Sequence, residues 1–220
     1  MTTVLITGAS SGIGLALCAV YRERGAQVIA ACRKAGDDLR ALGVEIVEGL
    51  DVTLPEAGTT LLQTLGGRDL DILINNAGVF GDSRLGTIDY EDVLRQFQVN
   101  ALAPLRLTEA LLPRLKSGAK VGMITSRMGS IADNGSGAYY AYRMSKAALN
   151  AAGVSLARDL APRGVAVALL HPGFVRTRMV GFAGDIGPDE SARRIAARLD
   201  ALSLANSGGF WHSNGDELPW

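Results

Sequence analysis

Short apolar runs alternate along this chain with longer segments in which apolar residues recur every three or four positions. Runs of about four to eight apolar residues are typical of strands buried on both faces, and the longer repeat is typical of helices. The pattern predicts strands over residues 3–7, 27–32, 44–48, 71–75, 120–125, 165–171 and 210–211, and helices over 12–24, 36–42, 55–65, 90–115, 142–161 and 188–201. Apolar strands separated by helices form a parallel sheet covered on both faces. We therefore expect a doubly wound α/β fold of about seven strands.

The length and composition of the chain are those of one domain. Its 220 residues contain no linker-like or low-complexity stretch, so a single domain over residues 1–220 is expected. Hydrophobic residues make up 48% of the chain, which is enough for a large core. Because the formal net charge is zero, the chain has no overall field that would attract nucleic acid or anionic lipid.

No segment has the pattern of a membrane span or a targeting signal. The longest apolar run, residues 165–170, is far shorter than the roughly 20 residues that a spanning helix needs. A strand begins almost at once, without a charged leader and an apolar targeting core, so a cytoplasmic location is expected. Cys18 and Cys32 fall in a predicted helix and strand, which indicates buried thiols rather than a disulfide or a metal site.

A glycine-rich turn, Thr7-Gly8-Ala9-Ser10-Ser11-Gly12-Ile13-Gly14, joins the first predicted strand to the first helix. Glycines there permit a tight turn and close backbone approach, so that amide N–H groups and the helix N-terminus face a pyrophosphate. The bare spacing is weak evidence, because glycine turns join strands to helices in many folds. Its place as the first such turn indicates a dinucleotide site. The predicted contacts are Gly8, Ser10, Ser11, Gly12, Ile13 and Gly14.

The end of the second predicted strand indicates which dinucleotide binds. An acidic residue there accepts hydrogen bonds from a free ribose 2′-hydroxyl group, whereas arginine accommodates a 2′-phosphate. This chain has Arg33 and Lys34 at that point and no carboxylate until Asp37. Since a planar guanidinium suits a phosphate, NADP(H) is predicted over NAD(H). The alternative, that both cations are solvated loop charges, stays open.

A tyrosine and a lysine form the most informative pair. Tyr142 and Lys146 are 146 − 142 = 4 positions apart, which places them on one face of a helix. A cation within about 4–6 Å favours the phenolate and lowers the tyrosine pKa from its ordinary value of about 10. Such a tyrosine can exchange a proton near neutral pH, although the same pair also arises by chance on amphipathic helices.

Taken together, these residues resemble the short-chain dehydrogenase/reductase family, in the family's order, over residues 3–177. The resemblance implies a single-domain Rossmann fold and a nicotinamide-dependent oxidoreductase. It identifies Tyr142 and Lys146 as the acid–base pair and Ser126, at the end of the fifth strand, as the catalytic serine. It also places Asn100 where a helix asparagine holds a water in a proton relay.

The resemblance extends the predicted cofactor site beyond the glycine loop and Arg33. It implies that Asp51 and Val52 contact the adenine, and that Asn75, in an Asn-Asn-Ala-Gly segment, lies by the adenosine ribose. The segment 172–177 resembles the one that binds the nicotinamide carboxamide. The further contacts that it implies are Asp51, Val52, Asn75, Ala77, Gly78, Tyr142, Lys146, Pro172, Gly173, Val175 and Thr177.

Within the family, residues 140–150 and 207–220 are similar to a subgroup of sniffer-type carbonyl reductases and C-factor-like signalling proteins. One departure from the family pattern is the separation of Ser126 from Tyr142, 142 − 126 = 16 positions, which is a few more than usual. We expect the extra residues 133–137 to bulge outward as a turn. Tyr139 and Tyr140 are not expected to act, since neither has a lysine four residues later. Another departure is Ser11, which occupies a loop position that is basic in many NADP-preferring members. The predicted preference for NADP(H) therefore depends on Arg33 alone.

The sequence therefore predicts NADPH-dependent reduction of an aldehyde or ketone to an alcohol, by reversible hydride transfer at a Ser-Tyr-Lys site. The C-factor resemblance supports a second hypothesis, a cofactor-binding signalling or sensor protein with little turnover. A short substrate loop near residues 178–187 carries apolar side chains and predicts an open, apolar pocket. The resemblance also implies a homodimer in which the helices over 90–115 and 142–161 pair across a twofold axis.

Overall fold

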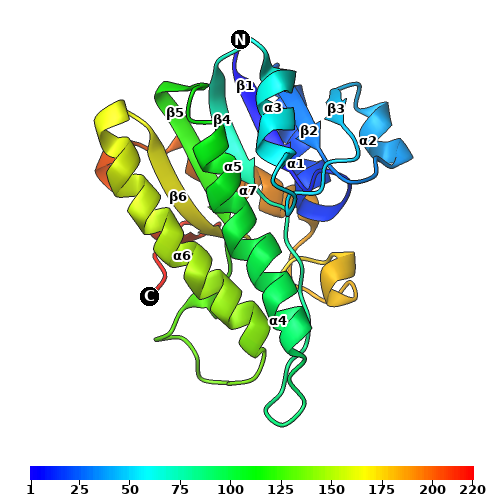
Figure 1. Cartoon of the computed structure of the whole chain (residues 1–220), viewed down its shortest axis with the longest axis vertical. Helices are drawn as coiled ribbons and strands as arrows, with labels where there is room; N and C mark the ends of the chain where they lie inside the picture. The colour runs from blue at the N-terminus through cyan, green and yellow to red at the C-terminus, as the bar shows by residue number, and fades with distance from the viewer.

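Seven parallel strands form one sheet in the order β3-β2-β1-β4-β5-β6-β7 (Figure 1). The computed structural model describes residues 1–220. Its strands are β1 (Thr3–Thr7), β2 (Gln27–Ala31), β3 (Glu45–Val47), β4 (Leu70–Asn75), β5 (Leu115–Ile124), β6 (Ala166–His171) and β7 (Phe210–His212). The chain proceeds outward from β1 to β3, returns to β4 and then proceeds outward to β7. The predicted doubly wound Rossmann sheet is confirmed.

Helices cover both faces of this sheet (Figure 1). Successive side chains of a strand point to opposite faces, so Val4 and Ile6 of β1 join one buried cluster and Leu5 joins the other. The first cluster includes side chains of α1 and α7, and the second includes those of α3, α5 and α6. The helices are α1 (Gly12–Glu23), α2 (Asp37–Ala41), α3 (Ala57–Leu65), α4 (Tyr90–Phe97), α5 (Ala103–Ala110), α6 (Tyr140–Leu160) and α7 (Pro188–Asp200).

The prediction of one helix over residues 90–115 is wrong in two respects. A π-helical turn, Gln98–Leu102, separates α4 from α5, and α5 ends at Ala110. Pro113 has no N–H group with which to continue the helical hydrogen bonds, so the chain turns before it. Strand β5 then begins at Leu115, which pairs with Leu70 ahead of a register shift.

Strand β5 begins five residues before its predicted start at residue 120 (120 − 115 = 5), and the remaining predicted elements differ from the observed ones by one or two residues at their ends. Cys18 and Cys32 are free and buried, as predicted. None of the helices has the length and apolar character that crossing a bilayer requires.

Candidate active site

The motifs singled out in the sequence meet at the carboxyl edge of the sheet. The glycine loop follows β1, residues 75–78 lie at the end of β4, Ser126 follows β5, and residues 172–177 follow β6. Because all strands are parallel, these segments leave the same edge of neighbouring strands. The strand order reverses between β1 and β4, and ligands of such sheets bind at this switch point.

The glycine loop lies tightly against the end of β4. Gly8 has a φ of 66°, and a Cβ added there would lie 2.7 Å from the Ala77 Cα. A Cβ added to Gly14 would collide with the Gly8 carbonyl oxygen. Ser11, the N-cap of α1, makes no side-chain capping bond, so the first N–H groups of α1 are available to a phosphate. The loop thus has the shape and donors that a pyrophosphate requires.

Thr7 and Asn76 fasten the glycine loop to β4. The Thr7 Oγ1 accepts hydrogen bonds from the N–H groups of Asn76 and Ala77, both at 3.1 Å. In return, the Asn76 Nδ2 donates to the carbonyl oxygens of Thr7 at 2.9 Å and Gly8 at 3.2 Å. The sequence motifs contain both residues, but sequence reasoning assigned no role to either side chain. Their hydrogen bonds hold the glycine loop at a fixed distance from the end of β4, and these two segments together form the predicted cofactor cradle.

Helix α6 carries Tyr142 and Lys146 one turn apart, and β5 brings Ser126 to them. The Lys146 Nζ lies 5.7 Å from the centroid of the Tyr142 ring and donates to the Ile124 carbonyl oxygen at 2.8 Å. The Ser126 Oγ accepts the Met128 N–H at 3.1 Å, and the Ser126 side chain also forms a hydrogen bond with Tyr142. The three predicted catalytic side chains therefore lie together.

Burial dominates the pKa values of this acid–base pair. It raises the pKa of Tyr142 to about 12, and a hydrogen bond with Ser126 opposes that rise. Burial also lowers the pKa of Lys146 to about 7. The expected lowering of the Tyr142 pKa by Lys146 is absent from the protein alone, where removal from water is the main effect on both groups. A further positive charge near the phenol is needed to favour the phenolate.

Asn100 lies fully buried in the π-helical turn between α4 and α5. Its Oδ1 accepts the Val79 N–H at 2.8 Å, and its Nδ2 donates to the Val79 carbonyl oxygen at 2.9 Å and to the Ser145 Oγ at 3.0 Å. The side chain therefore holds the segment after β4 against α6. A Cβ on Gly78 would lie 3.3 Å from the Asn100 Oδ1 and 3.8 Å from the Lys146 Nζ. A water relay at this point would use the backbone of the π turn. Single π-helical turns of this kind are common at functional sites.

A family model described as short chain dehydrogenase matches residues 2–185 of the chain. The chain belongs to the short-chain dehydrogenase family.

Among curated proteins, this dehydrogenase is 43% identical over 226 residues to the 1-hydroxy-2-glutathionyl-2-methyl-3-butene dehydrogenase of Rhodococcus sp. (strain AD45), with all of both chains covered. It is 49% identical over 154 residues to the C-signal protein of Myxococcus xanthus, which covers 69% of this chain and 93% of the relative. The relatives of this chain thus include both a dehydrogenase and the C-signal protein, in line with the two resemblances noted in the sequence.

Two solved structures resemble this dehydrogenase over its whole length. The carbonyl reductase Sniffer of D. melanogaster has a TM-score of 0.90 and 29% identity, with 100% of both chains covered. A carbonyl reductase from Pseudomonas aeruginosa PAO1, solved in complex with NADP, has a TM-score of 0.85 and 35% identity, again with 100% of both chains covered. The predicted resemblance to sniffer-type reductases is confirmed.

The dehydrogenase has exposed cations at the end of β2. Arg33 and Lys34 are exposed there, on the predicted adenosine side. Asp51 accepts the Thr53 N–H at 2.9 Å and the Thr53 hydroxyl at 2.7 Å, and these bonds, with Arg33 nearby, hold its pKa below the ordinary value. Val52 is buried beside it. The positive charge of Arg33 thus faces open solvent where a 2′-phosphate is predicted.

Asn75 has its side chain inside the protein rather than in the cradle. It is only 2% exposed, and its Nδ2 donates to the Thr108 Oγ1 at 3.1 Å and to the Met123 sulfur at 3.4 Å. The side chain of the last residue of β4 points toward α5, because successive residues alternate between faces. The side chain is therefore in no position to contact a ribose, and only the backbone of Asn75 lies at the strand end.

The segment after β6 connects the cofactor cradle to the substrate loop. The Pro172 carbonyl oxygen accepts hydrogen bonds from the hydroxyls of Ser191 at 2.8 Å and Ser213 at 3.0 Å. Gly173 has a φ of 94°, and Val175 is buried and bridges to Ile186. The methyl group of Thr177 would lie 3.2 Å from a Cβ on Gly12. Residues 172–177 thus reach back to the glycine loop.

Ser83, in the loop after β4, fixes where α6 begins. Its side-chain oxygen accepts the Ala141 N–H at 3.1 Å, and its carbonyl oxygen accepts the Tyr139 N–H at 2.7 Å. These N–H groups at the start of the helix have no partner within the helix. From the same loop, the Phe80 ring meets the Tyr142 ring edge-on at 4.9 Å. Sequence reasoning missed both residues, since nothing local links this loop to α6.

A cavity of about 520 Å³ opens beside Ser126 and Tyr142. The substrate-loop residues in its lining are apolar, as predicted, but the lining also includes Arg127, Asp133 and Arg143. Residues 134–137 of the turn are exposed, as expected of an outward turn, and Arg143 donates hydrogen bonds to Ser136 and Gly137 within it. The cavity is lined by Ile13, Phe80, Thr125, Ser126, Arg127, Met128, Asp133, Ser136, Tyr139, Tyr142, Arg143, His171, Pro172, Gly173, Phe174, Val175, Thr177, Met179 and Val180.

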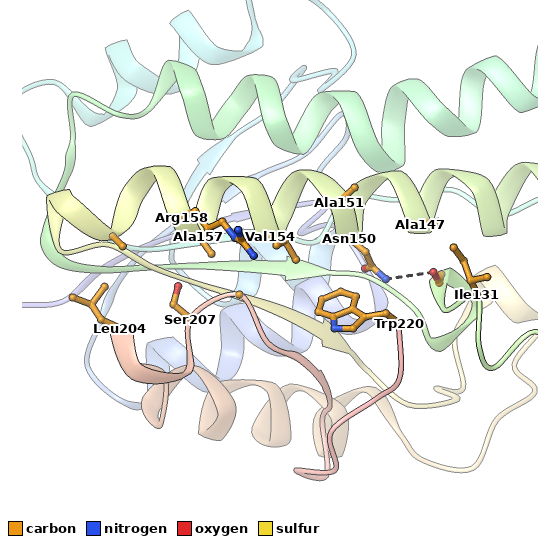
Figure 2. A pocket seen from close by; sticks show the side chains of 13 residues that line it. Ile131, Ala147, Asn150, Ala151, Val154, Ala157, Arg158, Leu204, Ser207 and Trp220 are labelled. Atoms are coloured by element: carbon orange, nitrogen blue, oxygen red, sulfur yellow. Dashed lines mark hydrogen bonds between the residues drawn. The ribbon is translucent and has the colours of Figure 1, made fainter.

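A second hollow, a groove of about 720 Å³, runs along another side of α6 (Figure 2). Ala147, Ala151 and Val154 form one side of it, and Leu204 and Trp220 lie on the other. Asn150 projects into the groove, but its amide is already paired with the Gly129 carbonyl oxygen at 3.5 Å and the Thr125 hydroxyl at 2.7 Å. The groove is apolar and holds none of the predicted site residues.

Proposed function

We propose that this dehydrogenase is an NADPH-dependent carbonyl reductase that converts an aldehyde or ketone to an alcohol. The observation that carries the proposal is a cavity lined by Ser126 and Tyr142, with the Lys146 Nζ 5.7 Å from the centroid of the Tyr142 ring and a glycine loop with open amides nearby. The nicotinamide cofactor supplies the hydride when it is bound. The glycine loop, the first N–H groups of α1 and residues 172–177 would hold that cofactor.

The protein residues orient the carbonyl group and supply its proton. The Ser126 hydroxyl, whose oxygen accepts the Met128 N–H, donates its proton to the carbonyl oxygen in a hydrogen bond. Tyr142 is protonated at neutral pH, since burial raises its pKa to about 12, and it donates its proton to the same oxygen. The apolar Phe80 ring on Tyr142 limits the access of water to that proton.

Lys146 stabilises the tyrosinate that remains after the proton leaves. Burial lowers the pKa of Lys146 to about 7, so its ammonium form and its amine form are close in free energy. A negative charge on the neighbouring phenol favours the ammonium form, and the two groups titrate as a coupled pair. The π turn at Asn100 is the proposed route by which solvent returns the proton.

The preference for NADP over NAD is part of the proposal and rests on Arg33. A guanidinium at the end of β2 can bind the 2′-phosphate that distinguishes the two cofactors. The Pseudomonas reductase with a similar fold was solved with NADP. A fluorescence titration with NADPH and NADH tests the preference, and equal affinities would contradict it.

The experiment that tests the activity is a panel of aldehydes and ketones with NADPH, followed by the loss of cofactor absorbance. Turnover that disappears with Tyr142→Phe supports the reductase. The likeness to C-signal supports a second candidate, a cofactor-binding signalling protein. Tight NADPH binding with no turnover of any carbonyl would favour that second candidate. A cytoplasmic location stays a prediction.

We also propose that the protein forms a homodimer through the side of α4, α5 and α6. Large apolar side chains are exposed along these elements, and small ones follow them on α6 at Ala147 and Ala151. Two copies related by a twofold axis could cover this surface with one self-complementary contact. The exposed apolar side chains are Leu94, Phe97, Leu102, Leu105 and Met144.

A further inference from the structure

One wall of the catalytic cavity carries charges that the proposed chemistry does not use. Arg127, Asp133 and Arg143 line this wall, beside Tyr142. The Arg127 Nε donates to the Asp133 Oδ2 at 2.5 Å, so these two charges form an ion pair and largely cancel. The lining of the cavity also includes apolar side chains of the substrate loop, Met179 and Val180 among them.

The guanidinium of Arg143 is bonded only to neutral groups. Its Nε donates to the Gly137 carbonyl oxygen at 3.3 Å, one Nη to the Met128 carbonyl oxygen at 3.4 Å, and the other Nη to the Ser136 hydroxyl at 2.9 Å. Arginine has five N–H donors, so two remain for another partner. Neutral acceptors hold the side chain in place without cancelling its charge. Arg143 is thus a fixed cation next to Tyr142 in the chain.

The other titratable groups of the cavity leave this charge uncompensated. Burial, then His212 and Arg127, lower the pKa of His171 to about 3, so His171 is neutral. Burial raises the pKa of Tyr142 to about 12, so Tyr142 is neutral too. Because Arg127 and Asp133 neutralise each other, the residues that line the cavity have a net charge of +1, which belongs to Arg143. Partial burial of Arg143 reduces the screening of this charge by solvent.

We propose that the substrate carries a carboxylate or a similar anionic group beyond its carbonyl group, and that Arg143 binds this anion. The proposal rests on the reductase function and names its class of substrate. A planar guanidinium with free N–H groups matches a carboxylate. The carbonyl group lies at Ser126 and Tyr142, the apolar body contacts the substrate-loop side, and the anion lies along the charged wall. Arg143 is then a specificity-determining residue.

The test compares benzaldehyde with 4-carboxybenzaldehyde, a pair that differs only in the anion. We expect the native protein to have a kcat/KM at least about tenfold higher for the carboxylated aldehyde, mainly through KM. Arg143→Gln should remove this preference, and Arg143→Lys should retain part of it. The preference should also fall as salt is added, since salt screens the attraction. Arg158→Gln, which removes a cation from the groove of Figure 2, is the control and should leave the preference unchanged.

Asp133→Asn supplies the reciprocal test. Removing the partner of Arg127 adds an uncompensated cation to the same wall, so the preference for the carboxylated aldehyde should rise. Equal kcat/KM values in the native protein, or equal losses for both aldehydes in Arg143→Gln, would show that Arg143 only holds the turn over 133–137. If neither aldehyde is reduced, the reductase proposal fails. Calorimetry can then measure the binding affinities of 4-carboxybenzyl alcohol and benzyl alcohol for the native protein and for Arg143→Gln. Tighter binding of the carboxylated alcohol in the native protein alone would support the role of Arg143, and equal affinities would contradict it.

Discussion

The two hollows beside α6 differ in chemistry more than in size. The groove of about 720 Å³ is the larger, yet its polar Asn150 is already paired and most of its lining residues are hydrophobic. The cavity of about 520 Å³ holds the end of β5, the start of α6 and the segment after β6. Only the cavity contains a tyrosine whose pKa is strongly shifted, with a buried lysine one turn further along α6.

The difference shows what the carboxyl edge of a parallel sheet contributes. Side chains at the ends of strands that are distant in sequence converge at this edge. The groove, in contrast, is lined by one helix, α6, and by the segments that pack against it. Perturbed titratable groups next to a cavity are a sign of function, and volume alone is not. The groove therefore fits contact with another protein surface, and the cavity fits chemistry. Four predictions bear on this assignment.

The largest effect is expected for Tyr142→Phe. Removal of the hydroxyl group removes the proposed proton donor and should lower kcat by about 10²–10⁴-fold, the usual range for a general acid. NADPH binding, measured by fluorescence titration, should change little, because the ring and its contact with Phe80 remain. Tyr139→Phe, which alters another tyrosine of the same cavity, is the matched control. Loss of activity in the control but not in Tyr142→Phe would show that the wrong tyrosine was chosen.

The pH dependence should differ between the two directions of the reaction. Oxidation of an alcohol requires the Tyr142 phenolate, and burial raises the pKa of that phenol to about 12. Below the effective pKa of the complex, the rate of oxidation should therefore rise by up to about tenfold per pH unit. Reduction requires the protonated phenol, which is already present at neutral pH. Its rate should be flat near neutrality and fall only at high pH. Initial rates in both directions across pH 6–10 would show this contrast or its absence.

Arg33→Asp should change the cofactor preference by an intermediate amount. The replacement removes the cation from the end of β2 and adds a carboxylate, which repels a 2′-phosphate and accepts a bond from a 2′-hydroxyl. We expect the ratio of NADPH to NADH affinity to fall by about tenfold or more, as for loss of a charge-assisted hydrogen bond. Lys34→Gln is the milder comparison, since it removes only the neighbouring charge. No change in the ratio would mean that Arg33 is a solvated loop residue.

The smallest effect on catalysis is expected in the groove. Ala151→Arg and Leu105→Arg place a charge on the proposed dimer surface, so sedimentation should show monomers where the native protein shows dimers. Ala151 lines the groove and lies away from the catalytic cavity, so kcat/KM should stay within about twofold. A native monomer at micromolar concentration, or a dimer that both variants leave intact, would contradict the dimer surface. A large loss of activity in Ala151→Arg would show that the groove and the cavity do not have separate functions.

The fold and the Tyr142–Lys146 pair could be predicted because their signals are local, whereas Ser126 was identified only through the family resemblance. Apolar strands, glycine turns and the spacing of Tyr142 from Lys146 are all visible within short windows of sequence. The π turn was not predicted, because apolar residues keep the helical spacing across it, although Pro104 at the start of α5 was a visible signal of an interruption. The end of that helix was misplaced although Pro113 was a visible signal, since a proline cannot continue the hydrogen-bond ladder.

The surroundings of the triad depend on contacts between distant segments and could not be predicted in the same way. The side of β4 to which Asn75 points is decided by the register of the sheet. The pKa values of Tyr142 and Lys146 depend on how completely the fold removes both from water, which no pairwise spacing contains. The binding of the turn over 133–137 to Arg143 becomes visible only in three dimensions.

The cap that Ser83 provides for α6 has a consequence for folding kinetics. The capping bond joins residues that are 58 positions apart, so the first turn of a catalytic helix is completed by a non-local contact. Closing such a long loop is slow compared with the growth of a helix. Most of α6 can therefore form before the loop after β4 docks on its N-terminus. In a refolding experiment, the helical circular-dichroism signal should recover first, and enzymatic turnover should recover only after this docking step.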